Sequence, residues 1–258
     1  MECIRFYFCA PDSVQWVRVM NSVASTLQGA GAFRALGLGA LVSLLVIGAA
    51  SAQTTKEEQA AMKPMDVLKD LMAGNERYIA GKNTQYDVDA SRKLTAEKGQ
   101  FPKAVILSCL DSRVPVELVF DQEIGDIFVG RVAGNVENED QLGSMEFATK
   151  LAGSKVVMVL GHTACGAVKG ACDGAELGKL TALLEKIQPA VESVEGHEGK
   201  RNSKNAEFVQ EVVEANVRMT VDDIRKRSEV LTEMEKKGEI MIVGAVYDLA
   251  TGKVTKID

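Results

Sequence analysis

Two short, mainly apolar runs of the chain each lead to a residue that can bind a metal ion. Residues 104–107 (AVIL) precede Cys109 by one residue, and residues 155–160 (KVVMVL) precede His162 by one residue. Runs of this length and composition predict buried strands of a parallel sheet. Functional sites in such sheets gather at the carboxyl ends of the strands. We therefore expect Cys109 and His162 to lie at the same edge of one sheet.

The rest of the chain alternates between strand and helix patterns. Further strands are expected at residues 127–132, 240–247 and 253–257. Apolar residues at helical spacing predict a helical turn at residues 114–120. They also predict five helices, at residues 64–80, 138–151, 164–172, 177–194 and 206–234, the last broken near Ser228. This order predicts an α/β fold with a mainly parallel β-sheet core flanked by helices.

Polar segments separate these elements. Residues 53–62 are expected to be mobile, and residues 81–100 show no continuous apolar face before Leu94. His197 lies in a polar, glycine-containing loop and is expected to be solvated. The sequence shows no internal repeat and no low-complexity linker, so residues 53–258 are predicted to form a single domain.

The N-terminal region has the pattern of an export signal. An apolar run of 16 residues, 35–50, is followed by the small-x-small sequence ASA. This predicts that residues 1–52 are cleaved as a signal peptide, so that Gln53 is the first mature residue of an exported, periplasmic protein. The run is shorter than the roughly 20 residues that a membrane span needs, so cleavage is favoured over a retained anchor, and no stable membrane insertion of the mature form is expected. Met1 and Met20 both remain possible start residues.

Charge and cysteine content exclude several classes of protein. The net charge of −6 gives no basic surplus for binding nucleic acid or an anionic membrane. Five cysteines are too few for a disulfide framework. Cys3 and Cys9 lie in the predicted signal peptide, which leaves Cys109, Cys165 and Cys172. That odd number suits metal ligation with one additional thiol, and Cys172 is expected to be packed in the core.

Cys109, His162 and Cys165 offer the soft and borderline ligands that Zn²⁺ prefers. Three protein ligands leave a fourth tetrahedral position for water, as catalytic zinc sites do. Asp111 and Arg113 follow the first cysteine by two and four residues. A carboxylate beside zinc-activated water can orient the nucleophile and accept its proton, while a bidentate arginine keeps that carboxylate ionised and off the metal. The pattern indicates zinc-assisted hydration or hydrolysis; the alternative for the two charged residues is an ordinary surface ion pair.

The motifs C-x-D-x-R and H-x-x-C, together with residues 131–135 (RVAGN), resemble the β-class carbonic anhydrases. The resemblance extends from about Met65 to Asp258. It implies reversible hydration of CO2 to bicarbonate and a proton, by attack of zinc-bound hydroxide. It also implies one Zn²⁺ per subunit and a catalytic dyad, with the metal on Cys109, His162 and Cys165 and the dyad formed by Asp111 and Arg113.

The resemblance further indicates the open-site, plant-like kind of this family. The bicarbonate-gated kind has a tryptophan three residues before the first cysteine, where this chain has Ile106. The open kind has a glutamine nine residues before it and a phenylalanine in the substrate pocket, matched here by Gln100 and Phe128. These two and Gly166 are the substrate-binding residues that the resemblance implies. Phe147 departs from the family, because relatives commonly have tyrosine there.

Family members form dimers or higher assemblies with clefts at the dimer interface. The resemblance therefore implies a homodimer or homotetramer in which Gln100 and Phe128 are contributed by a neighbouring subunit. CO2 and bicarbonate are the small-molecule partners that it implies.

Three other functions share parts of the pattern. A hydrolase of carbonyl sulfide or carbon disulfide on the same scaffold would use the same ligands, because these substrates are also small, linear and apolar. A non-catalytic zinc-binding exported protein would need a fourth protein ligand such as Asp111, which Arg113 is placed to hold away. A thiol–disulfide oxidoreductase has the least support, because the sequence contains no C-x-x-C.

Overall fold

The computed structural model describes residues 53–257 of the 258-residue chain. The predicted signal peptide at residues 1–52 lies outside the described residues. Within residues 53–257, no helix is both long enough and apolar enough to cross a membrane.

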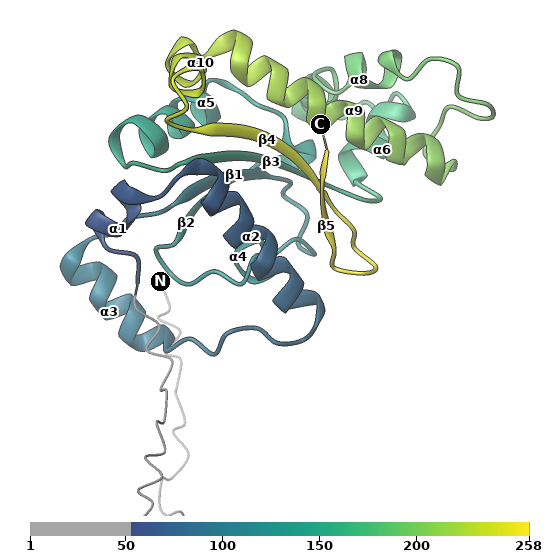
Figure 1. Cartoon of the computed structure of the whole chain (residues 1–258). Coiled ribbons are helices and arrows are strands. Elements are labelled where there is room, and N and C mark those ends of the chain that lie inside the picture. Colours follow the sequence, from purple (N-terminus) through teal and green to yellow (C-terminus); the bar gives the residue numbers. More distant parts are fainter. Residues whose placement is uncertain (1–52, 258) are drawn as a thin grey trace, which may run out of the picture. The chain divides into compact units, whose positions relative to one another are not determined.

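Five strands form one sheet with the order β2-β1-β3-β4-β5 (Figure 1). They are β1 (Ala104–Ser108), β2 (Ile127–Arg131), β3 (Val156–His162), β4 (Met241–Tyr247) and β5 (Val254–Ile257). The first four strands in that order are parallel, and β5 runs antiparallel to β4. The predicted α/β class with a mainly parallel core is confirmed.

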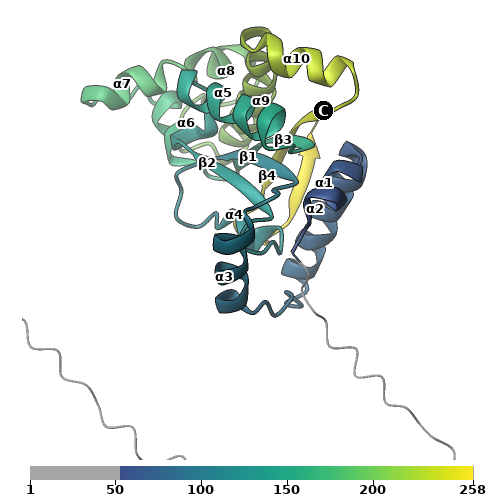
Figure 2. The same ribbon diagram turned by 90° about the vertical axis from the view of Figure 1, so that its left-hand side faces the viewer.

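Helices cover both faces of this sheet (Figures 1 and 2). One face carries α5 (Glu139–Glu146), α6 (Gly166–Cys172), α7 (Gly178–Leu184), α8 (Gln188–Ser193), α9 (Ala206–Arg227) and α10 (Glu229–Lys236). The other carries α1 (Lys56–Ala61), α2 (Pro64–Ile79), α3 (Val88–Lys98) and α4 (Val116–Val119). A π-helical segment, η2 (Phe147–Leu151), continues α5, and a short turn, η1 (Ala133–Asn135), follows β2.

Burial on both faces explains why the central strands are continuously apolar. In β1, Val105 and Leu107 pack into the core beneath α9, whereas Ala104 and Ile106 pack into the core beneath α2. Strand side chains alternate between faces, so each face of a doubly covered strand needs an apolar residue. Cys109 follows the same alternation and belongs to the core on the α9 side.

The predicted break near Ser228 is confirmed. Helix α9 ends at Arg227, and the Ser228 hydroxyl accepts a hydrogen bond from the Leu231 N–H to cap α10. The helix expected over residues 177–194 is instead two helices, α7 and α8, and Pro189 lies in the first turn of the second. Proline favours the start of a helix because its ring fixes φ and it has no N–H to satisfy.

Two expectations for polar segments were wrong: that residues 53–62 are mobile and that His197 is solvated. Residues 53–62 contain helix α1, and residues 81–100, which show no continuous apolar face before Leu94, contain helix α3. Thr55 and Glu58 form a reciprocal capping box at α1, and the Asp87 side chain caps α3, so these helices are specified by their ends and not by an apolar face. The side chain of His197 is only 4% exposed, because its ring packs 5.2 Å from that of Phe208.

Candidate metal centre

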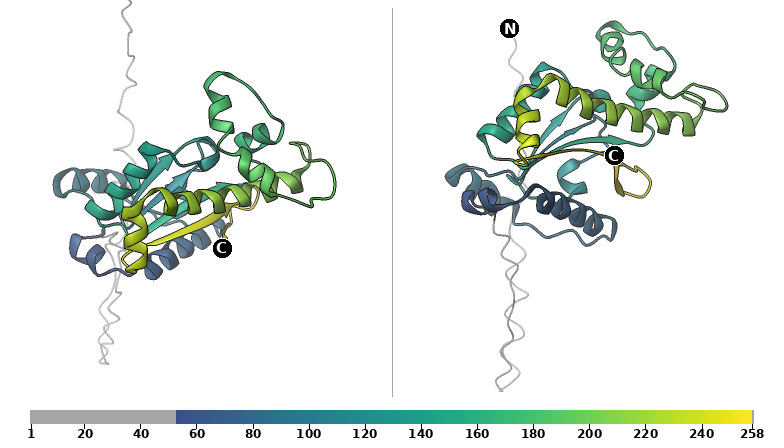
Figure 3. Two further views of the ribbon diagram at one scale, coloured as in Figure 1. Left: turned by 90° about the horizontal axis from the view of Figure 1, so that it is seen from above. Right: turned by 45° about the horizontal axis from the view of Figure 1, so that its top comes forward.

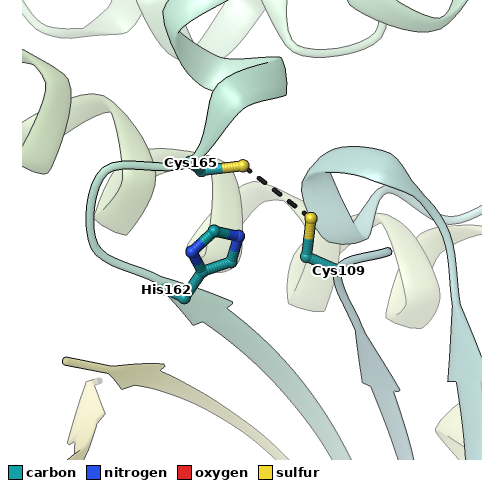
Figure 4. A group of neighbouring side chains, drawn as sticks. All are labelled: Cys109, His162 and Cys165. Carbon is teal, nitrogen blue, oxygen red and sulfur yellow. Dashed lines mark hydrogen bonds between the residues drawn. The ribbon is translucent and has the colours of Figure 1, made fainter. Parts of the chain in front are cut away.

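Three possible metal ligands converge at the carboxyl edge of the sheet (Figure 4). Cys109 directly follows β1, His162 ends β3 and Cys165 directly precedes α6. Their ligand atoms all lie within 4.8 Å of one another, and all three residues are buried. The expectation that Cys109 and His162 share one sheet edge is confirmed, since β1 and β3 are parallel neighbours.

The geometry of these side chains fits a zinc ion. The Sγ atoms of Cys109 and Cys165 are 3.9 Å apart, and two Zn–S bonds at a tetrahedral angle require about 3.8 Å. His162 Nδ1 lies 3.0 Å from the carbonyl oxygen of Thr163. A carbonyl can only accept, so Nδ1 carries the proton and the Nε2 lone pair is free to bind a metal. His162 Nε2 is buried and has no hydrogen-bond partner among the described residues.

Electrostatics around the two sulfurs favour a bound cation. Their contact lowers the pKa of Cys109 and raises the pKa of Cys165, while burial raises both. Without a cation, one thiolate and one thiol sharing a proton are therefore favoured over two adjacent thiolates. Burial raises the pKa of both thiols, but hydrogen bonds from backbone N–H groups lower it. These groups belong to Asp111 and Gly134 at Cys109, and to Ala167 and Val168 at Cys165. A divalent cation placed between the sulfurs favours the thiolate form of both.

Asp111 and Arg113 form a bidentate pair beside this cluster. Arg113 Nε donates to Asp111 Oδ1 at 2.9 Å, and its Nη2 donates to Oδ2 at 2.7 Å. Hydrogen bonds from Arg113 hold the pKa of the Asp111 carboxyl well below its usual range. Asp111 Oδ2 lies 3.8 Å from His162 Nε2. An ionised acceptor thus borders the ligand cluster, with both of its oxygens engaged by arginine.

The implied substrate residues lie in different places. Gly166 is the first residue of α6, next to Cys165. Gln100 is exposed and lies before the amino end of β1, whereas Cys109 follows its carboxyl end, and the strand between them is about 17 Å long. Phe128 pairs in register with Val105, near the same amino end of β1. A single chain therefore does not bring Gln100 or Phe128 to the ligand cluster.

Phe128 lines a groove of about 810 Å³ between the β2 edge of the sheet and α5. Its ring meets that of Phe147 edge to face, with centroids 6.3 Å apart. Phe147 lies in the same groove and is 55% exposed. The groove thus presents an apolar wall at the surface of one chain.

Four hydrogen bonds around Cys109 could not be foreseen from the sequence. Arg131 donates from Nε to the Cys109 carbonyl oxygen at 3.0 Å, and from Nη2 to the carbonyl oxygen of Asp111. The Gly134 N–H donates to Cys109 Sγ, and Asn216 donates to the Gly134 carbonyl. Residues 131–135 carried the only sequence signal for these contacts, as part of a motif without an assigned role.

Comparison with known proteins gives a consistent result. The sequence model of a family described as carbonic anhydrase matches residues 104–254. Carbonic anhydrase 2 of Mycobacterium tuberculosis is 34% identical over 200 residues, which cover 76% of this chain and 93% of that protein. A carbonic anhydrase of Mycolicibacterium smegmatis is 33% identical over 196 residues, covering 74% of this chain and 92% of that protein.

Solved structures show the same fold. The β-carbonic anhydrase CafA of Aspergillus fumigatus superposes with a TM-score of 0.59 at 27% identity, covering 75% of this chain and 91% of that one. One of two tetrameric β-carbonic anhydrases from Sordaria macrospora gives a TM-score of 0.58 at 21% identity, covering 74% and 97% of the two chains.

Proposed function

Because this chain belongs to the β class of the carbonic anhydrase family, we propose that it catalyses the reversible hydration of CO2 to bicarbonate and a proton. The observation that carries this proposal is the buried cluster of Cys109, His162 and Cys165, whose free imidazole nitrogen faces the Asp111–Arg113 pair. Two thiols and one imidazole are a zinc-binding donor set with a fourth position left open.

Cys109, His162 and Cys165 would hold one Zn²⁺ per subunit. When bound, zinc supplies a hydroxide nucleophile at neutral pH, because it lowers the pKa of water to about 7. Asp111 would accept a hydrogen bond from the nucleophile and so orient it toward the substrate. Arg113 holds both oxygens of this carboxylate, which keeps Asp111 ionised and prevents it from becoming a fourth ligand.

We assign Gln100, Phe128 and Gly166 to substrate binding, the first two from a second copy of the chain in a homodimer or homotetramer. The position of Gln100 beyond the amino end of β1 supports a contribution across an interface. The apolar groove of Phe128 and Phe147 offers a surface on which a second copy would pack. Phe147 has no hydroxyl, so CO2 would meet a purely apolar wall at this position.

The N-terminal sequence supports export of this enzyme. We propose that residues 1–52 are removed as a signal peptide and that residues 53–258 form the periplasmic catalytic domain. The apolar run at residues 35–50 and the ASA sequence that follows it support this assignment.

Two alternatives predict different behaviour. A carbonyl sulfide or carbon disulfide hydrolase would turn over those substrates faster than CO2. A non-catalytic zinc protein would have a fourth protein ligand, but within residues 53–257 the ligand group contains only three residues. Arg113 occupies both oxygens of Asp111, the nearest carboxylate that could complete such a site.

The deciding experiment is stopped-flow CO2 hydration by protein beginning at Gln53, with zinc content measured on the same sample. We expect about one zinc per chain and faster turnover of CO2 than of carbonyl sulfide or carbon disulfide. Protein without stoichiometric metal, or with a preference for a sulfur substrate, would contradict the proposal. Light scattering of the same sample tests the assembly.

A further inference from the structure

The turn that follows β2 lies against the sulfur of Cys109. The Gly134 N–H donates to Cys109 Sγ with an N···S distance of 3.3 Å. The Val132 N–H donates to the carbonyl oxygen of Ser108 at 3.1 Å, which attaches the start of the turn to the end of β1. The turn is therefore fixed to the chain immediately before Cys109, and one of its N–H groups points at a metal ligand.

The backbone of this turn does not adopt its conformation without support. Gly134 and Asn135 have φ values of 71° and 46°, both in the left-handed region. Glycine adopts this region without steric cost, whereas Asn135 does so at a cost that the surrounding structure must offset. A Cβ on Gly134 would lie 2.5 Å from the end of the Ile187 side chain, so both the positive φ and the close packing favour glycine here. The surrounding structure must hold the turn in place.

Asn216 on α9 fixes the position of this turn. This residue is 3% exposed, and its Nδ2 donates to the Gly134 carbonyl oxygen at 2.8 Å. Helix α9 lies along β3 and β4, as seen from above in Figure 3. The next residue, Val217, packs so closely on Gly161 that a Cβ there would lie 2.5 Å from its methyl carbon. A single turn of α9 thus contacts both the turn that donates to the Cys109 sulfur and the strand that ends in His162.

We propose that Asn216 is a positioning residue of the metal centre, which holds the Gly134 carbonyl so that the N–H of the same residue is aimed at the Cys109 sulfur. This inference rests on the proposed function, because it assumes that zinc binds Cys109, His162 and Cys165. Donation of an N–H to a thiolate stabilises its negative charge and reduces the electron density that the sulfur gives to the metal. Asn216 thereby tunes the zinc ion without touching it.

The test compares Asn216→Leu and Asn216→Asp with Thr220→Val. Neither replacement at residue 216 can donate to the Gly134 carbonyl at neutral pH. Thr220 is a matched control, because it lies one turn further along α9 and is 4% exposed. In the Co²⁺-loaded protein, we expect the sulfur-to-cobalt charge-transfer band to move to longer wavelength in both Asn216 variants. Competition with a chelator should show zinc affinity weakened about 10- to 100-fold. Thr220→Val should change neither quantity.

Each outcome separates this inference from the proposed function. An unchanged band and affinity in a folded Asn216→Leu protein would overturn the positioning role alone, as would an equal change in Thr220→Val. Wild-type protein without a cobalt–thiolate band would overturn the metal site itself. Amide hydrogen exchange of the wild-type zinc protein provides a test that does not depend on the variants folding. Gly134 should be protected as strongly as Asn135, whose N–H binds the Val132 carbonyl, and an unprotected Gly134 would contradict the proposal.

Discussion

Two buried polar clusters of this molecule differ in whether their hydrogen-bonding capacity is used. At the carboxyl edge of the sheet, the imidazole of His162 has a buried nitrogen without a partner among the described residues. After α4, by contrast, the buried carboxylate of Asp121 accepts hydrogen bonds at both oxygens. Its donors are Arg77 of α2, the side-chain amide of Asn83, and the N–H and hydroxyl groups of Thr84.

This difference distinguishes a ligand-binding site from a cluster that stabilises the fold. A buried polar group without a partner carries a desolvation cost that a ligand can remove. A buried carboxylate with all its donors holds together the segments that supply them, here α2, the segment before α3 and the end of α4. The first cluster should therefore govern metal binding and activity, and the second should govern stability.

The largest expected effect comes from removing a sulfur from the first cluster. In Cys109→Ser we expect loss of stoichiometric zinc and a fall in CO2 hydration of at least about 10³-fold, because the nucleophile is no longer generated at neutral pH. Metal analysis and stopped-flow hydration measure both effects.

The matched control for that variant is Cys172→Ser. Cys172 lies outside the ligand group, and burial raises the pKa of its thiol to about 11. This variant should keep its zinc and its activity. Full activity in zinc-free Cys109→Ser protein would contradict the metal assignment.

A smaller loss is expected when the carboxylate beside the cluster is neutralised. Asp111→Asn keeps the size of the side chain but can no longer act as an ionised acceptor, so we expect kcat for CO2 hydration to fall about 10²-fold. Zinc content should stay at about one per chain, because Asp111 is not a ligand. Loss of zinc in this variant would indicate that Asp111 helps to bind the metal.

The sequence was informative where a single local pattern decides the structure. Strands β1 and β3 are buried on both faces, so their apolar runs could be recognised, and Cys109 and His162 follow directly from the strand ends. Helices α1 and α3 were missed because they bury few residues, Gln59 and Ser91 respectively, and so lack an apolar stripe.

Contacts between distant segments were beyond the reach of local patterns. Asn216 lies 82 residues from Gly134, and Gly134 lies 25 residues from Cys109. The burial of His197 depends on Phe208 of α9, which is also invisible in the loop sequence. Spacing in the sequence identifies side chains at strand ends, but only the packed helices show which groups hold them.

Removal of charge from the second cluster should reduce stability and leave the chemistry intact. In Asp121→Asn we expect the free energy of unfolding to fall by about 3 kcal/mol. This value is at the low end for a broken buried ion pair, because the partner Arg77 is 38% exposed and partly screened by water. Urea unfolding measures this change. The folded variant should keep its zinc and its kcat, and a large loss of either would show that the two clusters are coupled.

Asp89→Asn is the matched control for that variant. Asp89 pairs with Arg92 and Lys93 on the exposed surface of α3, where ion pairs contribute little, so its replacement should leave the unfolding curve nearly unchanged.

The smallest expected effect is a difference in how two aspartates respond to acid. Burial of Asp121 opposes ionisation, but hydrogen bonds from Arg77 and Thr84 outweigh it and lower the pKa of this carboxyl. Its ionised form therefore stabilises the folded state above the unfolded pKa of about 3.9, and that contribution is lost as the pH falls further. Burial raises the pKa of Asp126 instead, so its stabilising contribution is present at low pH and is lost as the pH rises.

The two aspartates should thus give opposite slopes when unfolding is measured against pH. Between about pH 3 and 6, the stability difference between parent and Asp121→Asn should grow as the pH rises, whereas the difference between parent and Asp126→Asn should shrink. Urea titrations in the Cys109→Ser background measure these slopes without a contribution from metal release. Parallel slopes for the two variants would contradict the assignment of Asp121 as the carboxylate stabilised by its donors, because burial alone would then control both groups.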